Sequence, residues 1–387
     1  MDLTLSYEQE EFRATTRRLL DAAPVHAAGF DAAAYAAAWV MFAQAGVAGL
    51  CLKPQWGGFS GEPEDIALIA AELGRAPGAA PRIETMVMSA MLLSAGSSPL
   101  VEALRNRLAA GTLQPAVACH EGGDPFGRDQ PCTQVRPAGE GYVLTGRKAA
   151  AIGAETADCL IVSAQLPSGE LALLTIDPSE PGIDRFGYRL FDTTPVADLV
   201  FHDVPVAVGG LIAQGQAARV ALDEAFDGAL LAQCAAALGG IDRAIELSIF
   251  HLKTRQQFGQ PLAGFQVLQH RVADMFIAAN EARSSLYSAL AATRASPAVR
   301  SAAASRCKVK IAAVAKSVVG DALHLHGGIG ITTEYPVGHL YRRAMVDDLL
   351  LGGGTYHLAL LEGAFADELL SDMRAPQPLA CKRAANP

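Results

Sequence analysis

The sequence has few charged residues and no excess of positive charge. Only 18% of its 387 residues are charged, and 40 acidic against 31 basic residues give a formal net charge of -9. Such a charge repels a phosphate backbone, so we expect no nucleic acid partner. A small phosphorylated ligand remains compatible with this net charge, because a few local arginines and helix N-termini can bind phosphate against an unfavourable overall charge.

The cysteines are few, and their spacing shows no metal-binding or disulfide pattern. Their number is odd and no two form a C-x-x-C pair, which argues against a zinc site or a disulfide framework. We therefore expect no metal, and a reducing cytoplasm is the simplest compartment. The seven are Cys51, Cys119, Cys132, Cys159, Cys234, Cys307 and Cys381.

Signal-peptide and membrane-spanning patterns are also missing. The first five residues, MDLTL, are not a basic segment followed by an apolar run. The longest uncharged stretch, residues 85–101, contains several serines, Gly96 and Pro99, and is too polar to cross a bilayer. We expect it to form a buried helix and the turn that follows.

The hydrophobic pattern changes twice along the chain. Residues 1–114 carry helical stripes such as Ile66, Ile69 and Leu73, whereas residues 115–215 contain short β-rich runs separated by turn residues. Long alanine-rich helical segments return over residues 216–373, and residues 374–387 are predicted to be a loose tail. The sequence thus predicts an α+β multidomain protein, with helical domains on either side of a β-barrel or sandwich and ligands at the domain junction.

A first motif, TRQQFGQPL at residues 254–262, breaks one helix before the next begins near Phe265. It leaves Arg255 and Phe258 at an exposed helix end, where a guanidinium can bind a pyrophosphate bidentately and a ring can cover a ribose or adenine. Gln266 and Gln269 follow on one helical face and offer paired donors and acceptors. Each residue alone is typical of an ordinary loop, but the complete run favours a ligand site.

A second motif, HLHGGIG at residues 324–330, contains three glycines within four positions. Glycines there let the backbone approach a ligand closely and present its N–H groups. A glycine-capped helix C-terminus is the simpler interpretation of this motif taken alone.

Together the two motifs resemble the acyl-CoA dehydrogenase family, and the helical, β, helical order agrees over nearly the whole chain. The resemblance implies a C-terminal four-helix bundle, FAD as cofactor, an electron-accepting flavoprotein partner, and α,β-desaturation of an acyl-CoA. It also implies contacts to the adenine and pyrophosphate half of an FAD held mainly by a neighbouring subunit. Carried over, these contacts fall on Arg255, Phe258, Gln266, Gln269, His324, Leu325, Gly327 and Gly328, with His324 replacing the more usual Gln.

The family's catalytic base has no counterpart at its usual place. The family has a Glu in an E-G-T segment, where this chain reads LLLGGGT, so the position falls on Leu351 or Gly352 and neither accepts a proton. Some members place the Glu on the helix before the first motif, where Asp223, Glu224 and Asp227 stand; of these Asp227 is the in-chain candidate. Acids at a solvated helix start are the competing interpretation of all three.

The flavin-binding segment of the family is altered as well. Where the family has an aromatic residue and a hydroxyl after T-G-x-K, this chain has Ala149, Ala150, Ala151 and Ile152, although backbone N–H groups remain available there. This combination resembles the small subunits of heterotetrameric (α2β2) bacterial acyl-CoA dehydrogenases of steroid, alicyclic and dicarboxylic acid catabolism, including the pimeloyl-CoA type. The leading expectation is a subunit whose partner supplies the base.

Three alternatives remain open. The chain can be a self-sufficient homotetrameric dehydrogenase that uses Asp227 or Glu224, a flavin oxidase or monooxygenase on the same fold, or a non-catalytic subunit that binds CoA or has a structural role. The sequence does not name the acyl group, because pocket shape depends on tertiary packing.

Overall fold

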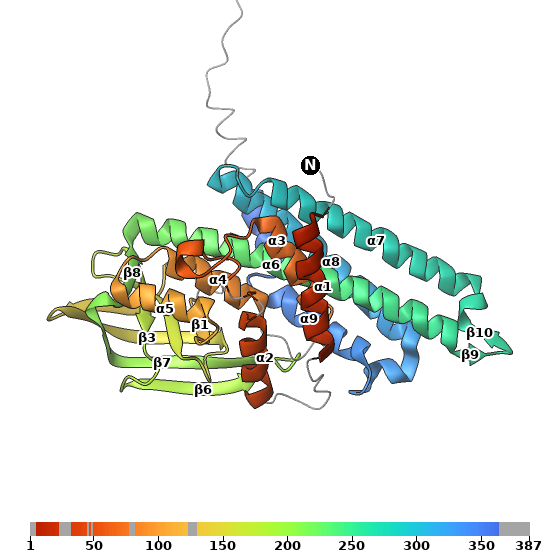
Figure 1. Ribbon diagram of the computed structural model, residues 1–387, viewed down its shortest axis with the longest axis horizontal. Coiled ribbons are helices and arrows are strands. Elements are labelled where there is room, and N and C mark those ends of the chain that lie inside the picture. Colours follow the sequence, from red (N-terminus) through yellow and green to blue (C-terminus); the bar gives the residue numbers. More distant parts are fainter. Residues whose placement is uncertain are drawn as a thin grey trace, which may run out of the picture.

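The computed structural model describes residues 5–22, 32–44, 46–47, 49–76, 82–122 and 130–363. The predicted tail at residues 374–387 lies outside these ranges. Within them the chain forms an N-terminal group of helices, a central sheet and a C-terminal group of long helices (Figure 1), which confirms the predicted fold class.

The N-terminal helices are α1 (Tyr7–Ala22), α2 (Ala32–Gln44), α3 (Pro63–Gly74), α4 (Ile83–Ser94) and α5 (Pro99–Ala109), with a short 3-10 turn at Pro54–Trp56. Proline occupies the first turn of α3 and α5, where its missing N–H costs nothing. Ser98 caps α5 by accepting a hydrogen bond from the Val101 N–H. The predicted buried helix within residues 85–101 is α4, most of whose residues are buried.

The central domain is one mixed eight-stranded sheet. Its strands are β1 (Pro115–Ala118), β2 (Gln134–Ala138), β3 (Gly141–Ile152), β4 (Cys159–Gln165), β5 (Leu171–Ile176), β6 (Ile183–Arg189), β7 (Pro195–Val206) and β8 (Leu211–Gln214). Their order is β6-β7-β3-β2-β4-β5-β8, with β1 paired in parallel to β4. β4 and β5 are buried almost throughout, because the sheet has a hydrophobic core of its own in addition to its contact with the helices.

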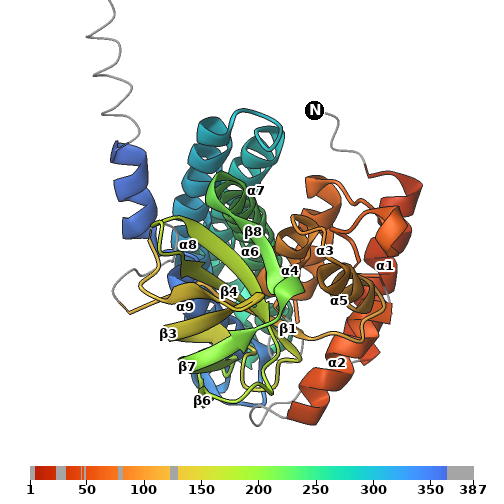
Figure 2. The same ribbon diagram turned by 90° about the vertical axis from the view of Figure 1, so that its left-hand side faces the viewer.

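The C-terminal helices are α6 (Gly215–Thr254), α7 (Gln266–Ala291), α8 (Pro297–His326) and α9 (Pro336–Leu349). A hairpin of β9 (Gln256–Gln257) and β10 (Gln260–Pro261) joins α6 to α7 at the end of the molecule farthest from the sheet (Figure 1). α6 packs against α3 and α4 as well as α7, α8 and α9, so it lies between the two helical groups (Figure 2). Among the described residues, no helix combines the length and apolarity needed to span a bilayer.

α3 and α6 approach each other closely at two glycines. A Cβ on Gly74 would lie 1.8 Å from the Ala236 carbonyl oxygen, and a Cβ on Gly239 would lie 1.8 Å from the Ala71 carbonyl oxygen. Both neighbours are helix backbone, which cannot move aside as a flexible side chain can. The absence of side chains at these positions therefore sets the distance between the N-terminal helices and α6.

We predict that Gly239→Ala destabilises the protein by about 1–3 kcal/mol or more, because overpacking forces the two helices apart. The matched control is Gly240→Ala, where the nearest atom to the new Cβ is the Gly74 carbonyl oxygen at 3.4 Å. This control should be neutral or stabilising by up to about 1 kcal/mol, since alanine is the better helix former. Urea unfolding of the two variants measures the difference, and equal stabilities would contradict the close crossing.

Candidate functional site

An apolar cavity of about 360 Å³ lies where the three domains meet. α4 contributes Glu84, Thr85 and Met88, while the sheet contributes residues of β1 and β3 and the segments after β1 and β6. α6 contributes Phe226, and the end of α9 with the loop after it contributes Val346 and Leu349 to Leu351. Its volume and lining are those of a small-molecule site.

The loop after α9, where the sequence analysis expects the position of the family's base, holds no acid at residues 350–355. Leu351 lines the cavity with a φ of 57°, and its carbonyl oxygen is 3.0 Å from His357 Nε2. Gly352 has a φ of 101°, and a Cβ there would lie 2.5 Å from the Tyr356 ring. A glutamate therefore cannot stand at residue 352 without rearranging this loop.

The altered segment of β3 also faces the cavity, through Ala150 and Ile152. The Ala149 N–H donates to the His120 carbonyl oxygen at 2.9 Å, and the Ala150 N–H donates to Asp198 Oδ1 at 2.9 Å. The expectation that backbone N–H groups here remain available for a flavin is therefore wrong for these two residues, because both are used within the protein. An aromatic ring and a hydroxyl are absent from this wall.

Glu84 is the one acidic side chain that lines the cavity among the described residues, and the sequence interpretation missed it. It lies in the first turn of α4 with a side chain only 2% exposed. Oε1 accepts a hydrogen bond from Arg82 Nε at 2.5 Å, whereas Oε2 is buried with no hydrogen-bond partner in the part of the chain that the structure describes. In the sequence, Glu84 is the last charged residue before a long uncharged run, and this position could have drawn attention to it. The same position is equally typical of an ordinary acid at the start of a helix.

Arg82 connects the three domains beneath this cavity. Besides Glu84 of the N-terminal helices, it binds Asp192 of the β domain at 2.9 Å and Asp347 of α9 at 2.6 Å. Burial alone would lower the pKa of Arg82, but the three carboxylates outweigh it and raise that pKa. Burial likewise tends to raise the pKa of Asp347, yet Arg343, Arg82 and Lys308 hold it below its usual value. Arg82 and Asp347 are therefore both charged at neutral pH.

The structure places Asp227 outside this cavity, although its neighbour Phe226 lines it. Asp227 Oδ2 accepts a hydrogen bond from Arg300 Nε at 3.0 Å, and Glu224 lies 3.4 Å from the same guanidinium. Both acids line a separate cavity of about 220 Å³, and Asp223 lines neither. Arg300 thus holds both carboxylates in ion pairs outside the apolar cavity.

The residues predicted to contact FAD gather at the other end of α6. Arg255 is exposed and follows the last residue of α6, and Phe258 is 88% exposed with a φ of 56°. Gln266 begins α7, and Gln269 Nε2 donates to the Ala263 carbonyl oxygen at 2.7 Å. An exposed aromatic side chain in a left-handed conformation is costly, which favours a functional role for this turn.

The glycine motif lies at the same end of the molecule. The rings of His251 on α6 and His326 on α8 are 4.6 Å apart, and this contact joins the last turns of the two helices. His324 is exposed and Leu325 is buried. Gly327 has a φ of 63°, and a Cβ on Gly327 or Gly328 would meet nothing within 4 Å. The space beside the backbone at these two glycines is therefore open, and their contact with FAD stays a prediction.

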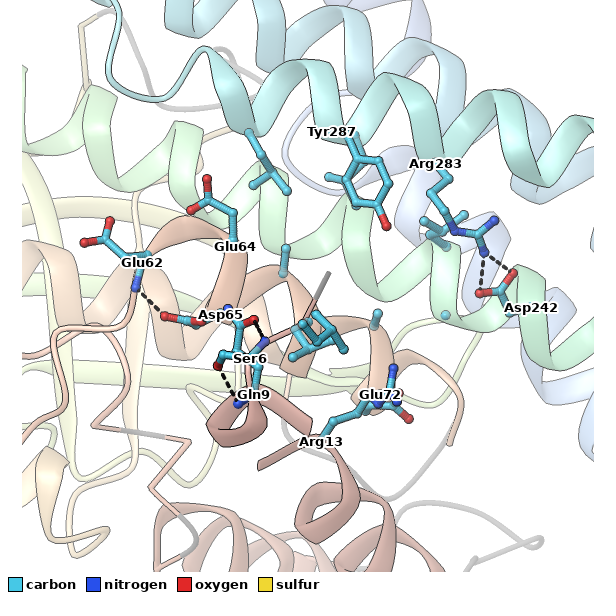
Figure 3. A pocket seen from close by; sticks show the side chains of 18 of the residues that line it. Ser6, Gln9, Arg13, Glu62, Glu64, Asp65, Glu72, Asp242, Arg283 and Tyr287 are labelled. Atoms are coloured by element: carbon cyan, nitrogen blue, oxygen red, sulfur yellow. Dashed lines mark hydrogen bonds and ion pairs between the residues drawn. The ribbon is translucent and has the colours of Figure 1, made fainter. Parts of the chain in front are cut away.

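A third cavity, of about 680 Å³, lies between α1, α3, α6 and α7 (Figure 3). Its charged side chains bind one another: Arg283 pairs with Asp242 at 2.8 Å, and Arg17 pairs with Glu72 at 2.6 Å. Most of the charged side chains that line this cleft are thus paired within the protein. No metal-binding group of three His, Cys, Asp or Glu side chains occurs in the described ranges.

Comparison with known sequences identifies the family. The model of "Acyl-CoA dehydrogenase, C-terminal domain" matches residues 218–362, and that of "Acyl-CoA dehydrogenase, N-terminal domain" matches residues 6–112. The chain belongs to the acyl-CoA dehydrogenase family. The acyl-CoA dehydrogenase IpdE2 of Mycolicibacterium smegmatis is 28% identical over 319 residues, which are 82% of this chain and 84% of that protein.

Solved structures share the whole fold. A variant of the Tcur3481-Tcur3483 steroid ACAD is 27% identical with a TM-score of 0.82, covering 95% of this chain and 100% of that one. A glutaryl-CoA dehydrogenase from Mycobacterium smegmatis in complex with FADH2 has a TM-score of 0.82 at 21% identity, covering 94% of this chain and 95% of that one. FAD is the cofactor of this family.

The two regions of this chain differ in how well they fit that cofactor. The exposed Arg255 guanidinium, the Phe258 ring and the open backbone at Gly327 and Gly328 suit the phosphate and adenine half. The cavity suits the flavin half poorly, because the N–H groups of Ala149 and Ala150 are already bonded and Ile152 offers no hydroxyl. At a rise of about 1.5 Å per residue, α6 separates Phe226 in the cavity from Arg255 by roughly 44 Å.

We predict that Arg82→Met destabilises the protein by about 3–5 kcal/mol at neutral pH, since three buried carboxylates lose their shared cation. The wild-type Asp347 pKa is depressed, so its contribution is present above its unfolded pKa and is lost as pH falls through the folded value. The deficit of the variant should accordingly shrink on acidification, because protonation removes the uncompensated charge.

Chemical unfolding at a series of pH values measures this deficit. The control is Arg189→Met, which removes a part-exposed ion pair with Glu155 and should cost at most about 1 kcal/mol. A deficit in Arg82→Met that is equally small, or that grows towards acid pH, would refute the assignment of Arg82 as the shared buried cation.

Proposed function

We propose that this chain is one subunit of an FAD-dependent acyl-CoA dehydrogenase that carries out α,β-desaturation of an acyl-CoA. In this proposal Arg255, Phe258 and the Gly327–Gly328 backbone contribute to the adenine and pyrophosphate half of an FAD whose flavin lies in a partner chain. The bound FAD supplies the hydride acceptor. The partner is a homologous acyl-CoA dehydrogenase chain in an α2β2 assembly, and it supplies the base.

One observation carries the proposal: the FAD-contacting residues and the cavity stand at opposite ends of α6. A single FAD cannot place its phosphates at Arg255 and its flavin beside Phe226 when about 44 Å of helix separates them. The Arg255 region must then serve an FAD that another chain holds. This separation also exists in a homo-oligomer, so the choice of an unlike partner depends on the cavity.

The cavity favours the unlike partner. Leu351 and Gly352 cannot abstract a proton, and the β3 wall has independently lost the side chains that would meet a flavin. A pocket that no longer carries out the reaction explains both the missing base and the altered β3 wall, whereas relocation of the base explains only the first. Asp227 and Glu224, the alternative base candidates, are both bound to Arg300 in a different cavity.

The surface around Arg255 supports a permanent interface. Large apolar side chains are exposed along the end of α6, on α7 and beside the glycine motif, and a shared cofactor site needs such an interface. They are Phe250 at 64%, Phe258 at 88%, Val267 at 66%, Phe276 at 58%, Ile277 at 58% and Ile331 at 74% exposure. Burial between chains would remove this area from water.

Three other functions are separated from this one by experiment. A self-sufficient homotetrameric dehydrogenase predicts that the chain alone binds yellow FAD and turns over acyl-CoA. An oxidase or monooxygenase predicts oxygen consumption, and a non-catalytic subunit predicts full activity of the partner without this chain. Activity that requires both chains, with an electron-accepting flavoprotein, supports the proposal.

We predict that Arg255→Ala in the assembled complex loses most of its FAD, because a bidentate cation for the diphosphate is removed. Arg255→Lys should restore FAD only in part, since an ammonium lacks the planar fork. Absorbance of the purified complex measures the flavin content per protein. The control is Arg243→Ala, which removes an arginine of α6 that forms an ion pair with Glu246. If Arg255→Ala retains as much flavin as Arg243→Ala, the proposed role of Arg255 is wrong.

We predict that the double substitution Glu224→Gln, Asp227→Asn leaves turnover near normal in the complex. Removing a general base typically lowers the rate at least about a hundredfold. Steady-state turnover with FAD still bound tests this, and a loss of that size would show that the base lies in this chain. Arg300→Gln serves as a companion variant, because it removes the other side of the ion pair with Asp227 and Glu224. If this ion pair is purely structural, Arg300→Gln and the double substitution should both lower the stability of the protein and leave the turnover rate unchanged.

A further inference from the structure

The two segments predicted to contact FAD follow the ends of different helices. Arg255 follows the last residue of α6, and its N–H donates to the His251 carbonyl oxygen at 2.8 Å. Gly327 follows His326, the last residue of α8, and begins the glycine turn at residues 327–331. Because helix ends fray, one FAD can use both segments together only if a contact fixes their relative position.

A pair of histidine rings forms such a contact. The rings of His251 and His326, which we call the histidine pair, have centroids 4.6 Å apart and an interplanar angle of 33°. His326 is 5% exposed, its Nδ1 donates to the Ala322 carbonyl oxygen at 2.7 Å, and the Tyr335 ring lies 4.9 Å away. A Cβ on Gly330 would lie 3.1 Å from the His326 Cβ, so the glycine turn packs directly on this side chain. His326 is therefore held between α6, the glycine turn and the residue before α9.

The neutral form of the histidine pair is the form that this contact favours. Burial lowers the pKa of His326, although the carbonyl oxygens of Ala322 and Leu247 favour its charged form. Burial also lowers the pKa of His251, and the charges of His326 and Arg255 lower it further. Two protonated rings at this separation would repel each other, and the His251 cation would also be repelled by Arg255.

Among the described residues, no carboxylate stabilises a charge on the histidine pair. The side-chain charges that act on the two rings are those of His326 and Arg255. Glu246, on α6, is paired with Arg75 and Arg243. Glu334, which precedes α9, is exposed to solvent. Protonation of the pair thus lacks a counter-ion. The other titratable groups on the adjoining turns of α6, α8 and α9 are Lys253, His324, Tyr335, His339 and Arg342.

We propose that His326 is a positioning residue, whose ring contact with His251 holds the turn after α6 and the glycine turn in the arrangement that binds the FAD phosphates. Protonation of the histidine pair opens this contact. The inference rests on the proposed function, because it concerns the FAD that these two turns would bind. Both pKa values are lowered from 6.5 in the folded chain, so the open arrangement takes up protons first. The closed arrangement is therefore favoured at neutral pH and is lost as the pH falls below about 6.5.

The test measures the affinity of the assembled complex for FAD between about pH 5 and pH 8. In the wild type, the dissociation constant for FAD should rise as the pH falls, by at most about tenfold per pH unit for each proton taken up. His326→Phe keeps an aromatic ring and cannot take up a proton, so its affinity should change much less over this range. His326→Ala removes the ring and should bind FAD about two- to tenfold more weakly at neutral pH.

His202→Ala is the matched control. It removes an exposed histidine of β7 that pairs with Asp184 at 3.1 Å, and it should follow the wild type at every pH. If His326→Phe does not fold, His251→Phe takes its place, because His251 is only half-buried and its substitution also removes a titrating ring while keeping a ring contact.

Hydrogen exchange of the full-length chain without FAD tests the contact by itself. After correction for the intrinsic rates, amides 255–262 and 327–331 should lose protection at acid pH in the wild type and keep it in His326→Phe. The inference is overturned if the two proteins show the same exchange or the same pH dependence of FAD affinity. Tighter FAD binding at acid pH would also overturn it, because the imidazolium would then bind the phosphates itself.

Failure of the proposed function gives a different result. FAD absent from the complex at every pH, with exchange that still responds to pH, would reject the proposed function and with it the cofactor role of the histidine pair. FAD bound equally well by the wild type, His326→Phe and His326→Ala at every pH would reject only the positioning role.

Discussion

The buried ion cluster around Arg82 is the interaction on which the arrangement of the domains depends. One guanidinium at the start of α4 binds a carboxylate of its own helix, one from the β domain and one from α9. Each of the three domains thus supplies a charge that would be uncompensated if that domain moved away. The cavity exists where it does because this cluster fixes the relative positions of α4, the sheet and α9.

α6 connects that cluster to the second functional region. It is 40 residues long and largely buried along its first 38 positions, so it acts as a rigid spacer between the cavity and the hairpin that carries Arg255 and Phe258. The cavity therefore lies at one end of the chain, and the residues suited to FAD phosphates lie at the other. Under the proposed function, a molecule built in this way completes its cofactor site by association, which fits the apolar side chains exposed near the hairpin.

Much of the fold follows from the sequence, because local periodicity and turn chemistry act over a few residues. The change from helical stripes to short β-rich runs and back predicted the three-part order, and the break at Gly259 and Pro261 predicted the end of α6 near Arg255. Exposure at Arg255 and an open backbone at Gly327 also follow from local signals, since a helix end and a positive-φ glycine need no distant partner. The acyl-CoA dehydrogenase family was likewise recognisable from the motifs.

The chemistry of the cavity was decided by tertiary structure. The sequence showed that Leu351 and Gly352 cannot act as a base, but it drew attention to Asp227, which the fold directs to Arg300 in another cavity. Glu84 carried no local signal beyond that of a helix-start acid. Its buried ion pair depends on Arg82, whose other partners lie more than a hundred residues away in sequence. The sequence by itself determined which residues stand at helix ends and glycine turns, because those features depend on neighbouring positions. Only the packed structure decided which buried charges share a partner and which acids lie in which cavity, because burial and pairing depend on residues brought together from three domains.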